Sequence, residues 1–306
     1  MKCVHGLEWY RFELSIQGRS DLKMKNKFAR VRLFLLLLSL VVTVATAATP
    51  VCQSHYPSPA ATEAMLTMAD RTAQQLDALP GTQVAIIARS GQNLSRYGLR
   101  HSHVAFVVRE ADGQWRVRHL LNHCKSRASE LYREGLANFI GETAQTGDLR
   151  LGVLAPSLQQ RLYPLLTTQN GLMQRLHEPR YSAVAYPFTT GYQNSNQWVL
   201  EIIAAALAAA DGPMPDNRNK VQAWLRKAHY KPSSLHLSLG QRFGARFTVT
   251  NATTTDHPWG ERISGNYSVV TVESIFNFLL ERGVLIGDQS IAHQPPPSSS
   301  NSGASP

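Results

Sequence analysis

Histidines gather in two neighbouring stretches of the sequence, and a serine far from them opens a strongly helical segment. His101 and His103 flank a serine at the head of one apolar run, and His119 lies in the next. Ser195 directly precedes an alanine-rich segment with helical spacing. A helix N-terminus favours the anionic form of a nucleophile, and a neighbouring imidazole can take its proton. The pattern predicts Ser195 as nucleophile, His103 as base and His119 as the residue that orients the base.

Each of these residues also has a structural interpretation. Serine is a preferred N-cap residue, so Ser195 can serve only to start its helix. No G-x-S-x-G motif surrounds Ser195, although that motif marks many serine nucleophiles. His103 and His119 can be strand residues without a chemical role.

The two histidine stretches lie on a predicted β-hairpin. The runs 103–109 and 115–121 have strand character, and Asp112-Gly113 between them is a turn signal. A two-residue turn at this dipeptide would place His103 opposite Asn122. Asn122 would then replace His119 as the residue that orients His103.

A slip of one residue in this hairpin would exchange the faces of the side chains. It would bring four imidazoles to one face of the hairpin, those of His101, His103, His119 and His123. Four imidazoles permit a metal site, but no H-E-x-x-H or C-x-x-C spacing supports one. We therefore expect neither a metal nor a cofactor.

The remaining pattern predicts one α+β domain in which an antiparallel sheet packs on helices. Beyond the hairpin, helices are expected at 59–79, 126–141, 158–166, 196–210 and 221–228. Strands are expected at 83–89, 234–239 and 244–250, with a last strand and helix between 269 and 282. No internal repeat or linker interrupts residues 55–288.

The N-terminal residues read as an export signal. Basic residues precede the apolar run 33–42, and small residues follow it up to Ala47, in the order of a signal peptide. The apolar stretch of about fifteen residues is shorter than the roughly twenty of a spanning helix. We expect a leader at 1–47, a domain at 48–290 and a disordered tail at 291–306. The mature protein would be periplasmic or secreted, and Met24 rather than Met1 would start a conventional signal peptide.

Export changes the interpretation of the cysteines. Removal of the leader leaves Cys52 and Cys124. An isolated pair in an oxidising compartment usually forms a disulfide. The alternative is a reactive thiol at Cys124, beside His123.

The charge distribution argues against a nucleic-acid partner. The formal net charge is +10, but half of this charge lies in residues 1–47. No basic cluster remains in the mature chain, so we expect no nucleic acid and no membrane contact beyond the leader.

Several stretches closely resemble an uncharacterised family of exported bacterial proteins, domain of unknown function 2145. The resemblance extends over about residues 50–285. It is carried by residues 84–103, 119–122, 131–136, 192–198 and 256–258. The family has no established activity, so the resemblance implies organisation and not function.

The order of the chemical residues is also similar to that of circularly permuted papain-like proteins, which include relatives of cell-wall amidases. In that group a histidine opens a strand, a polar residue lies on the next strand, and a nucleophile heads a long helix. Here His103, His119 and Ser195 follow this order, but serine stands where those enzymes carry cysteine. The similarity implies a papain-like fold and cleavage or transfer of acyl and amide groups.

Two functions therefore remain open. One is a hydrolase or acyltransferase for amide or ester bonds, acting on cell-wall peptides or lipids. The other is a catalytically inactive binding or assembly protein on the same scaffold. A groove would be lined by Tyr97, Tyr192 and Trp198, although such aromatics are often core residues. Asn122, Asp256 and His257 are further candidates for its wall, and Asp256 before His257-Pro258 can equally stabilise a turn.

Overall fold

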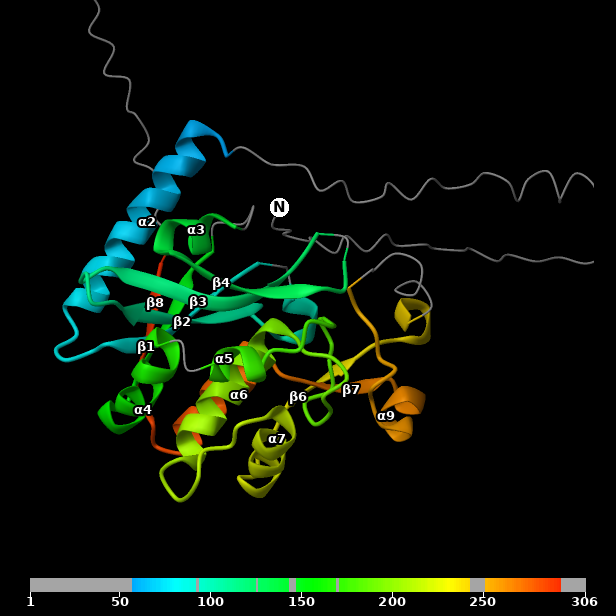
Figure 1. The fold of residues 1–306 in the computed structure, drawn as a ribbon. Coiled ribbons are helices and arrows are strands. Elements are labelled where there is room, and N and C mark those ends of the chain that lie inside the picture. Colours follow the sequence, from blue (N-terminus) through cyan, green and yellow to red (C-terminus); the bar gives the residue numbers. More distant parts are fainter. Residues whose placement is uncertain are drawn as a thin grey trace, which may run out of the picture. The chain divides into compact units, whose positions relative to one another are not determined.

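Apolar strands form the centre of the fold. The protein is described here by a computed structural model, which covers residues 57–91, 94–124, 126–142, 147–168, 171–242 and 251–292. Within these residues, six strands form one antiparallel sheet with the order β4-β3-β2-β1-β5-β8 (Figure 1). The strands are β1 (Val84–Arg89), β2 (His103–Arg109), β3 (Trp115–Asn122), β4 (Ser129–Gly135), β5 (Leu149–Leu154) and β8 (Leu285–Ile291).

Helices pack on both faces of this sheet, and a small ribbon of two strands follows α7 in the chain. The helices are α2 (Pro59–Asp77), α3 (Leu136–Gly141), α4 (Pro156–Thr167), α5 (Leu172–Arg175), α6 (Ser195–Ala208), α7 (Arg218–Lys227), α9 (Trp259–Ser264) and α10 (Val272–Glu281), with a 3₁₀ turn η1 (Ser95–Tyr97). The ribbon pairs β6 (Ser233–His236) with β7 (Asn266–Val269). None of the described helices has both the length and the apolar character that a membrane span requires.

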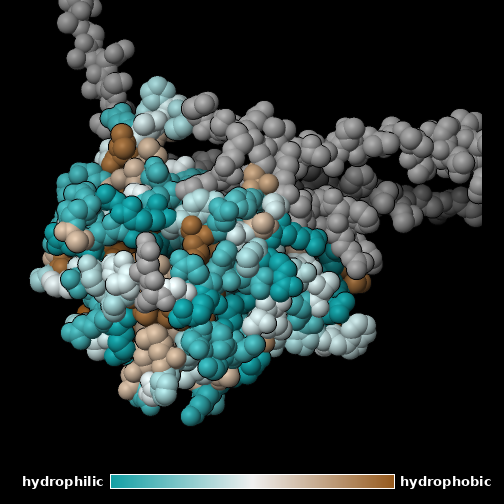
Figure 2. Space-filling view, viewed as in Figure 1, coloured by the Kyte–Doolittle hydropathy of each residue, from teal (hydrophilic) through white to brown (hydrophobic). Residues whose placement is uncertain are grey.

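The two faces of the sheet belong to two separate apolar clusters. Val104 and Phe106 of β2 pack with α4, α6 and α10. Ala105 and Val107 of the same strand pack with α2 and α3, which lie on the opposite side of the sheet in Figure 1. This alternation follows from the two-residue period of a strand that is buried on both faces. The face seen in Figure 2 is mostly hydrophilic, with small separate hydrophobic areas.

The predicted α+β class, with an antiparallel sheet packed on helices, is confirmed. Helix α2 begins as expected, because the Ser58 side chain accepts a hydrogen bond from the Ala61 amide and Pro59 follows the cap. The helix predicted at 126–141 is wrong. Its first half is strand β4, which pairs with β3 through seven residues, and only its second half is helix α3. Pairing with a neighbouring strand overrides the local helical spacing there.

The β2–β3 hairpin does not have the two-residue turn, and its register is the one shifted by one residue. Arg109 pairs with Trp115, and the Glu110 amide donates to the Gln114 carbonyl at 3.0 Å, so three residues, 111–113, rather than two form the loop tip. Gly113 closes this loop with φ of 79°, a conformation that glycine adopts without strain. The register therefore puts His103 and His119 on one face of the sheet.

Some predictions fall on parts of the chain that the structure does not describe. The leader at 1–47, Cys52, the strand at 244–250 and the tail from residue 293 lie outside the described residues. Strands β5 and β8 were not predicted at all, and they extend the sheet beyond β1.

A buried ion pair fixes helix α6 to the loop before it. Glu201 is fully buried, and its carboxylate accepts hydrogen bonds from Arg218 at 2.7 Å, Gln193 at 2.7 Å and Gln222 at 2.9 Å. The Arg218 guanidinium also donates to the backbone carbonyls of Thr190 and Tyr192. These bonds hold the loop that leads into the first turn of α6.

We expect Glu201→Ala to lower the free energy of unfolding by about 3–5 kcal/mol, because it leaves the Arg218 guanidinium buried without its counter-charge. Urea denaturation followed by circular dichroism measures this loss. Asp216→Asn is the control, since it breaks an exposed ion pair with Lys220 and should leave the midpoint unchanged. Equal midpoints for Glu201→Ala and the wild type would refute the assigned role.

Candidate active site

Ser195 is the first residue of α6, but it does not cap the helix. The N-cap is Asn194, whose side chain accepts a hydrogen bond from the Gln197 amide at 2.7 Å. The Ser195 hydroxyl is therefore available for another partner, and it lies 3.0 Å from Nδ1 of His103. The predicted approach of these two residues, 92 positions apart in sequence, is confirmed as a contact.

The contact continues into a chain of hydrogen bonds, here called the relay, formed by Ser195, His103, His119 and Glu134. Nε2 of His103 lies 2.9 Å from Nδ1 of His119. Nε2 of His119 in turn contacts the carboxylate of Glu134. His119 is fully buried, whereas Ser195 keeps 8% of its surface exposed, so the serine is the more accessible of the two.

Three adjacent strands supply the inner members of the relay. Two-residue periodicity and the observed registers place His103 of β2, His119 of β3 and Glu134 of β4 on the same face. Phe139 of α3 covers both imidazoles, with ring centroids 5.8 Å from His103 and 5.5 Å from His119. His103 is the first residue of β2, so its ring meets Ser195 where the strand begins.

Asn196 ties the start of α6 to the start of β2. Its side-chain oxygen accepts a hydrogen bond from the Val104 amide at 2.9 Å, and its side-chain nitrogen donates to the Ser102 carbonyl at 3.2 Å. Both partners flank His103 in sequence. Asn196 therefore fixes the distance between the serine and its histidine through the backbone.

The hydrogen-bond partners assign the tautomers of the relay. An ionised carboxylate only accepts hydrogen bonds, so Glu134 requires the proton on Nε2 of His119. With one proton on each ring, Nδ1 of His119 accepts from Nε2 of His103. Nδ1 of His103 is then the acceptor for the Ser195 hydroxyl. In each hydrogen bond of the relay, the donor is the group nearer the serine and the acceptor is the group nearer Glu134. His103 is therefore ready to accept the proton of the Ser195 hydroxyl.

The surroundings keep His103 neutral and thus able to accept. Burial, the positive charge of Arg89 and the neighbouring His119 lower the pKa of His103 well below its ordinary value of 6.5. Arg89 pairs with His103 across β1 and β2, and its charge attracts Glu134. That attraction favours the ionised carboxylate on which the direction of the relay depends.

Tyr181 is a further partner of the serine. Its hydroxyl lies close enough to Ser195 for the serine to affect the pKa of the phenol. Burial raises the pKa of Tyr181 above its ordinary value of 10, so the phenol keeps its proton. Tyr181 can therefore donate to the serine oxygen while His103 accepts from it.

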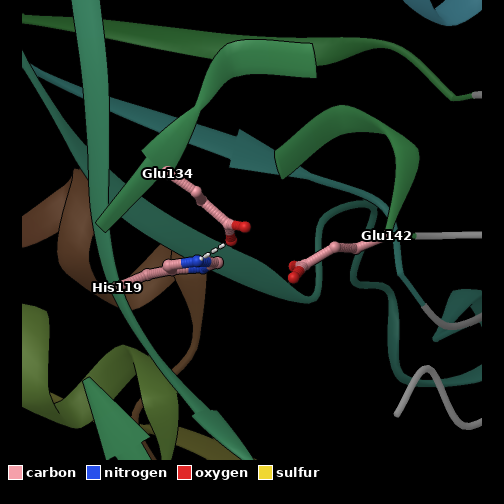
Figure 3. Close-up of side chains that lie close together, drawn as sticks. All are labelled: His119, Glu134 and Glu142. Atoms are coloured by element: carbon pink, nitrogen blue, oxygen red, sulfur yellow. Dashed lines mark hydrogen bonds and ion pairs between the residues drawn. The ribbon is translucent and has the colours of Figure 1, made fainter. Parts of the chain in front are cut away.

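The inner end of the relay holds a set of ligand-type groups. His119, Glu134 and Glu142 each bring a ligand atom within 4.8 Å of the other two, and Figure 3 shows the three side chains pointing toward one another. Arg89 forms an ion pair with Glu142 at 2.8 Å.

The sequence comparison assigns the chain to a family. The model of the family described as "Uncharacterized protein conserved in bacteria (DUF2145)" matches residues 75–279. The protein belongs to this family. No curated protein and no solved structure matches the chain. The matched region of the DUF2145 family contains all four relay residues and Tyr181.

Two of the other predicted residues lie away from the relay. Trp198 is a core residue, because its ring packs edge-on against Phe106 and its indole nitrogen donates to the Met173 carbonyl. It is only 1% exposed, so it cannot line a groove. Asn122 ends β3 and donates to the His123 carbonyl, and His119 takes the place beside His103.

The loop candidates have mainly structural partners. Asp256 accepts a hydrogen bond from the Tyr186 amide at 2.9 Å. His257 is buried between the Glu261 carboxylate at 2.8 Å and the Val184 carbonyl at 2.6 Å. These contacts match the turn interpretation of this loop.

The partly exposed aromatic candidates lie on arginine side chains. The guanidinium of Arg96 lies over the ring of Tyr97, and that of Arg180 lies over the ring of Tyr192. The histidines at the two ends of the hairpin do not join the relay. His123 contacts Glu130 instead, and the backbone amide of His101 faces Glu273.

Sequence reasoning missed three residues of the site, which are Arg89, Glu134 and Tyr181. Glu134 was hidden because its segment was interpreted as a helix, and a helix would not have aligned it with His119. An alternation of polar residues after a turn that follows β3 is the signal that would have indicated an edge strand. Tyr181 lies in a loop without periodicity, and only the tertiary structure brings it to Ser195.

The lowered pKa of His103 predicts how stability depends on pH. Above about pH 6.5 the imidazole is neutral in both the folded and the unfolded chain. Below this pH the unfolded chain binds a proton at this histidine and the folded chain does not. The free energy of unfolding therefore decreases as the pH falls from about 6.5 toward the pKa of His103 in the folded chain. His101 and His177, whose pKa values are also lowered by burial, act in the same direction. His103→Gln should flatten this dependence between pH 6.5 and 5 in urea titrations. An unchanged slope would contradict the assignment.

Proposed function

We propose that this protein is a hydrolase or acyltransferase that acts on amide or ester bonds, with Ser195 as its nucleophile. The observation that carries the proposal is the continuous relay from the Ser195 hydroxyl through His103 and His119 to Glu134. A serine becomes a nucleophile when an adjacent base takes its proton and a further group orients that base. The relay supplies both.

In the proposed reaction, Oγ of Ser195 attacks the carbonyl carbon of the substrate while its proton moves to Nδ1 of His103. His103 then gives this proton to the leaving amine or alcohol, and an acyl-serine remains. Attack by water releases the acid and makes the protein a hydrolase. Attack by another amine or alcohol makes it an acyltransferase.

Two features support charge development at Ser195. The N-terminus of α6 places the positive end of the helix dipole beside the serine, which favours a negative oxygen. The protonated Tyr181 hydroxyl beside Ser195 can donate a hydrogen bond to the same oxygen. His119 and Glu134 stabilise the imidazolium that forms when His103 accepts the proton.

The papain-like relationship belongs to this proposal as well. A histidine at the start of β2, a second polar residue on β3 and a nucleophile at the head of α6 are similar to the order in the circularly permuted members of that group. Under this proposal the substrates are cell-wall peptides or lipids, because the N-terminal residues have the pattern of an export signal.

Covalent labelling tests the nucleophile. A fluorophosphonate probe should label the wild-type protein once, at Ser195, and Ser195→Ala should abolish the label. His103→Ala should slow labelling about 10²–10⁴-fold, because it removes the general base. Peptide mass spectrometry locates the modified residue.

The matched control is His123→Ala, which removes a partly exposed histidine outside the relay and should label at the wild-type rate. Ser195→Ala leaves the helix cap intact, since Asn194 provides it, so loss of label cannot come from an unfolded helix. A folded wild-type protein that takes up no probe would refute the catalytic proposal and favour the binding or assembly protein.

We further propose that the mature protein is exported and carries a Cys52–Cys124 disulfide. Intact mass of periplasmic material should show a chain that begins near Ala48 and contains no thiol that reacts under denaturing, non-reducing conditions. Reduction should lower the free energy of unfolding by about 4 kcal/mol on the loop-entropy model. An intact leader, or alkylation of both cysteines without reductant, would contradict this.

A further inference from the structure

We propose that His119, Glu134 and Glu142 bind a divalent transition-metal ion such as Zn²⁺, and that the bound ion switches off the base. The binding site stands on its own geometry. The switching effect rests on the proposed function and describes its regulation.

The first step is the arrangement of the ligand atoms. His119 comes from β3, Glu134 from β4, and Glu142 follows α3 directly, and their ligand atoms lie within 4.8 Å of one another. Figure 3 shows the carboxylates of both glutamates on the same side of the imidazole ring of His119. Zinc ligands lie about 2.0–2.2 Å from the ion, so ligands that share one ion are up to about 4.4 Å apart. Small side-chain movements therefore suffice to close the site.

The second step is the chemistry of the donors. One imidazole and two carboxylates form a ligand set that zinc and related divalent ions accept in proteins, with open positions left for water. Glu142 has two oxygens, so it can keep its ion pair with Arg89 through Oε2 and turn the other toward the ion. A cation held between the two carboxylates would offset negative charge that is costly to bury.

The third step is the effect on the relay. A metal ion that binds Nε2 of His119 displaces the single proton of this ring from Nε2. In the neutral imidazole this proton moves to Nδ1, which then donates to Nε2 of His103. The proton of His103 moves to Nδ1 and points at the Ser195 hydroxyl. Metal binding thus replaces the His119–Glu134 hydrogen bond and reverses the other two bonds of the relay, so His103 can no longer accept from the serine.

Zinc binding to the purified full-length protein is measured first, with ZnCl₂ alone and a chromophoric chelator as competitor. We expect one tight site in the wild type. Glu142→Asp keeps the negative charge beside Arg89 but withdraws the carboxylate by one methylene, and it should weaken this site at least about tenfold. Glu130→Gln is the matched control, because Glu130 contacts His123 at the protein surface, and it should leave the tight site unchanged.

Wild-type protein without a tight site, or a tight site that Glu142→Asp leaves intact, would overturn the proposal. Thermal melts of both variants establish that they are folded. If Glu142→Asp does not fold, the ring ¹⁵N shifts of His119 in the wild type decide the question, because a bound ion must change them.

Two independent measurements test the effect of zinc on the base His103. Zinc should slow fluorophosphonate labelling of the wild type at least about tenfold and should not slow labelling of Glu142→Asp. The ¹⁵N shifts of His103 should show its proton moving from Nε2 to Nδ1 when zinc is added. Tight zinc binding with no change of this tautomer would overturn the switch. Protein that binds zinc and changes tautomer but never takes up the probe would refute the proposed function and leave the metal site standing.

Discussion

The burial of a polar first turn of α6 is the constraint on which the candidate site depends. Asn194, Ser195, Asn196 and Gln197 are all buried, although a helix usually begins at the surface where water satisfies its free amides. Here the protein supplies the partners, with Asn194 as cap and Asn196 bonded to both neighbours of His103. Every residue of α6 is buried, so the helix cannot shift without breaking these bonds. The distance between Ser195 and His103 is therefore fixed by the packing of α6 and by the hydrogen bonds of its first turn.

Polar side chains are also buried in the sheet, at the ends of β1 and β2 that lie near Ser195. Ala85, Ile87, Ala105 and Val107 occupy the face of β1 and β2 that packs on α2 and α3. Arg89 and His103 continue this face at the end of the strands that meets Ser195. Apolar residues would fill these positions with less loss of solvation. A hydrophobic core alone does not require an arginine and two histidines at these positions. Their presence favours a chemical role for Arg89, His103 and His119.

The parts of the fold and of the candidate site that could be predicted from the sequence are those that depend on interactions between residues close together in the chain. Strands β1 to β3 and helix α6 follow from local patterns, and Ser195 and His103 lie at element ends where distant segments meet. The hairpin register was open because it depends on one residue in the turn at Gly113. The role of Glu134 could not be predicted from the sequence. Its strand β4 is an edge strand of mixed polarity, and the pairing of β4 with β3 is a tertiary interaction. Helix α6 was predicted well, yet its cap was placed one residue late, at Ser195 instead of Asn194.

In the proposed mechanism, the length of the relay follows from the use of serine as the nucleophile. A thiol is partly ionised near neutral pH, whereas a serine hydroxyl loses its proton only to a base that is ready to take it. The burial that keeps His103 neutral also makes its imidazolium costly, so an isolated imidazole in this position would be a weak base. His119 and Glu134 resolve this conflict, because the positive charge formed at His103 is shared along hydrogen bonds that end at a carboxylate. The same hydrogen bonds make the base sensitive to any change in the proton on His119, so the residues that strengthen the base also control its direction.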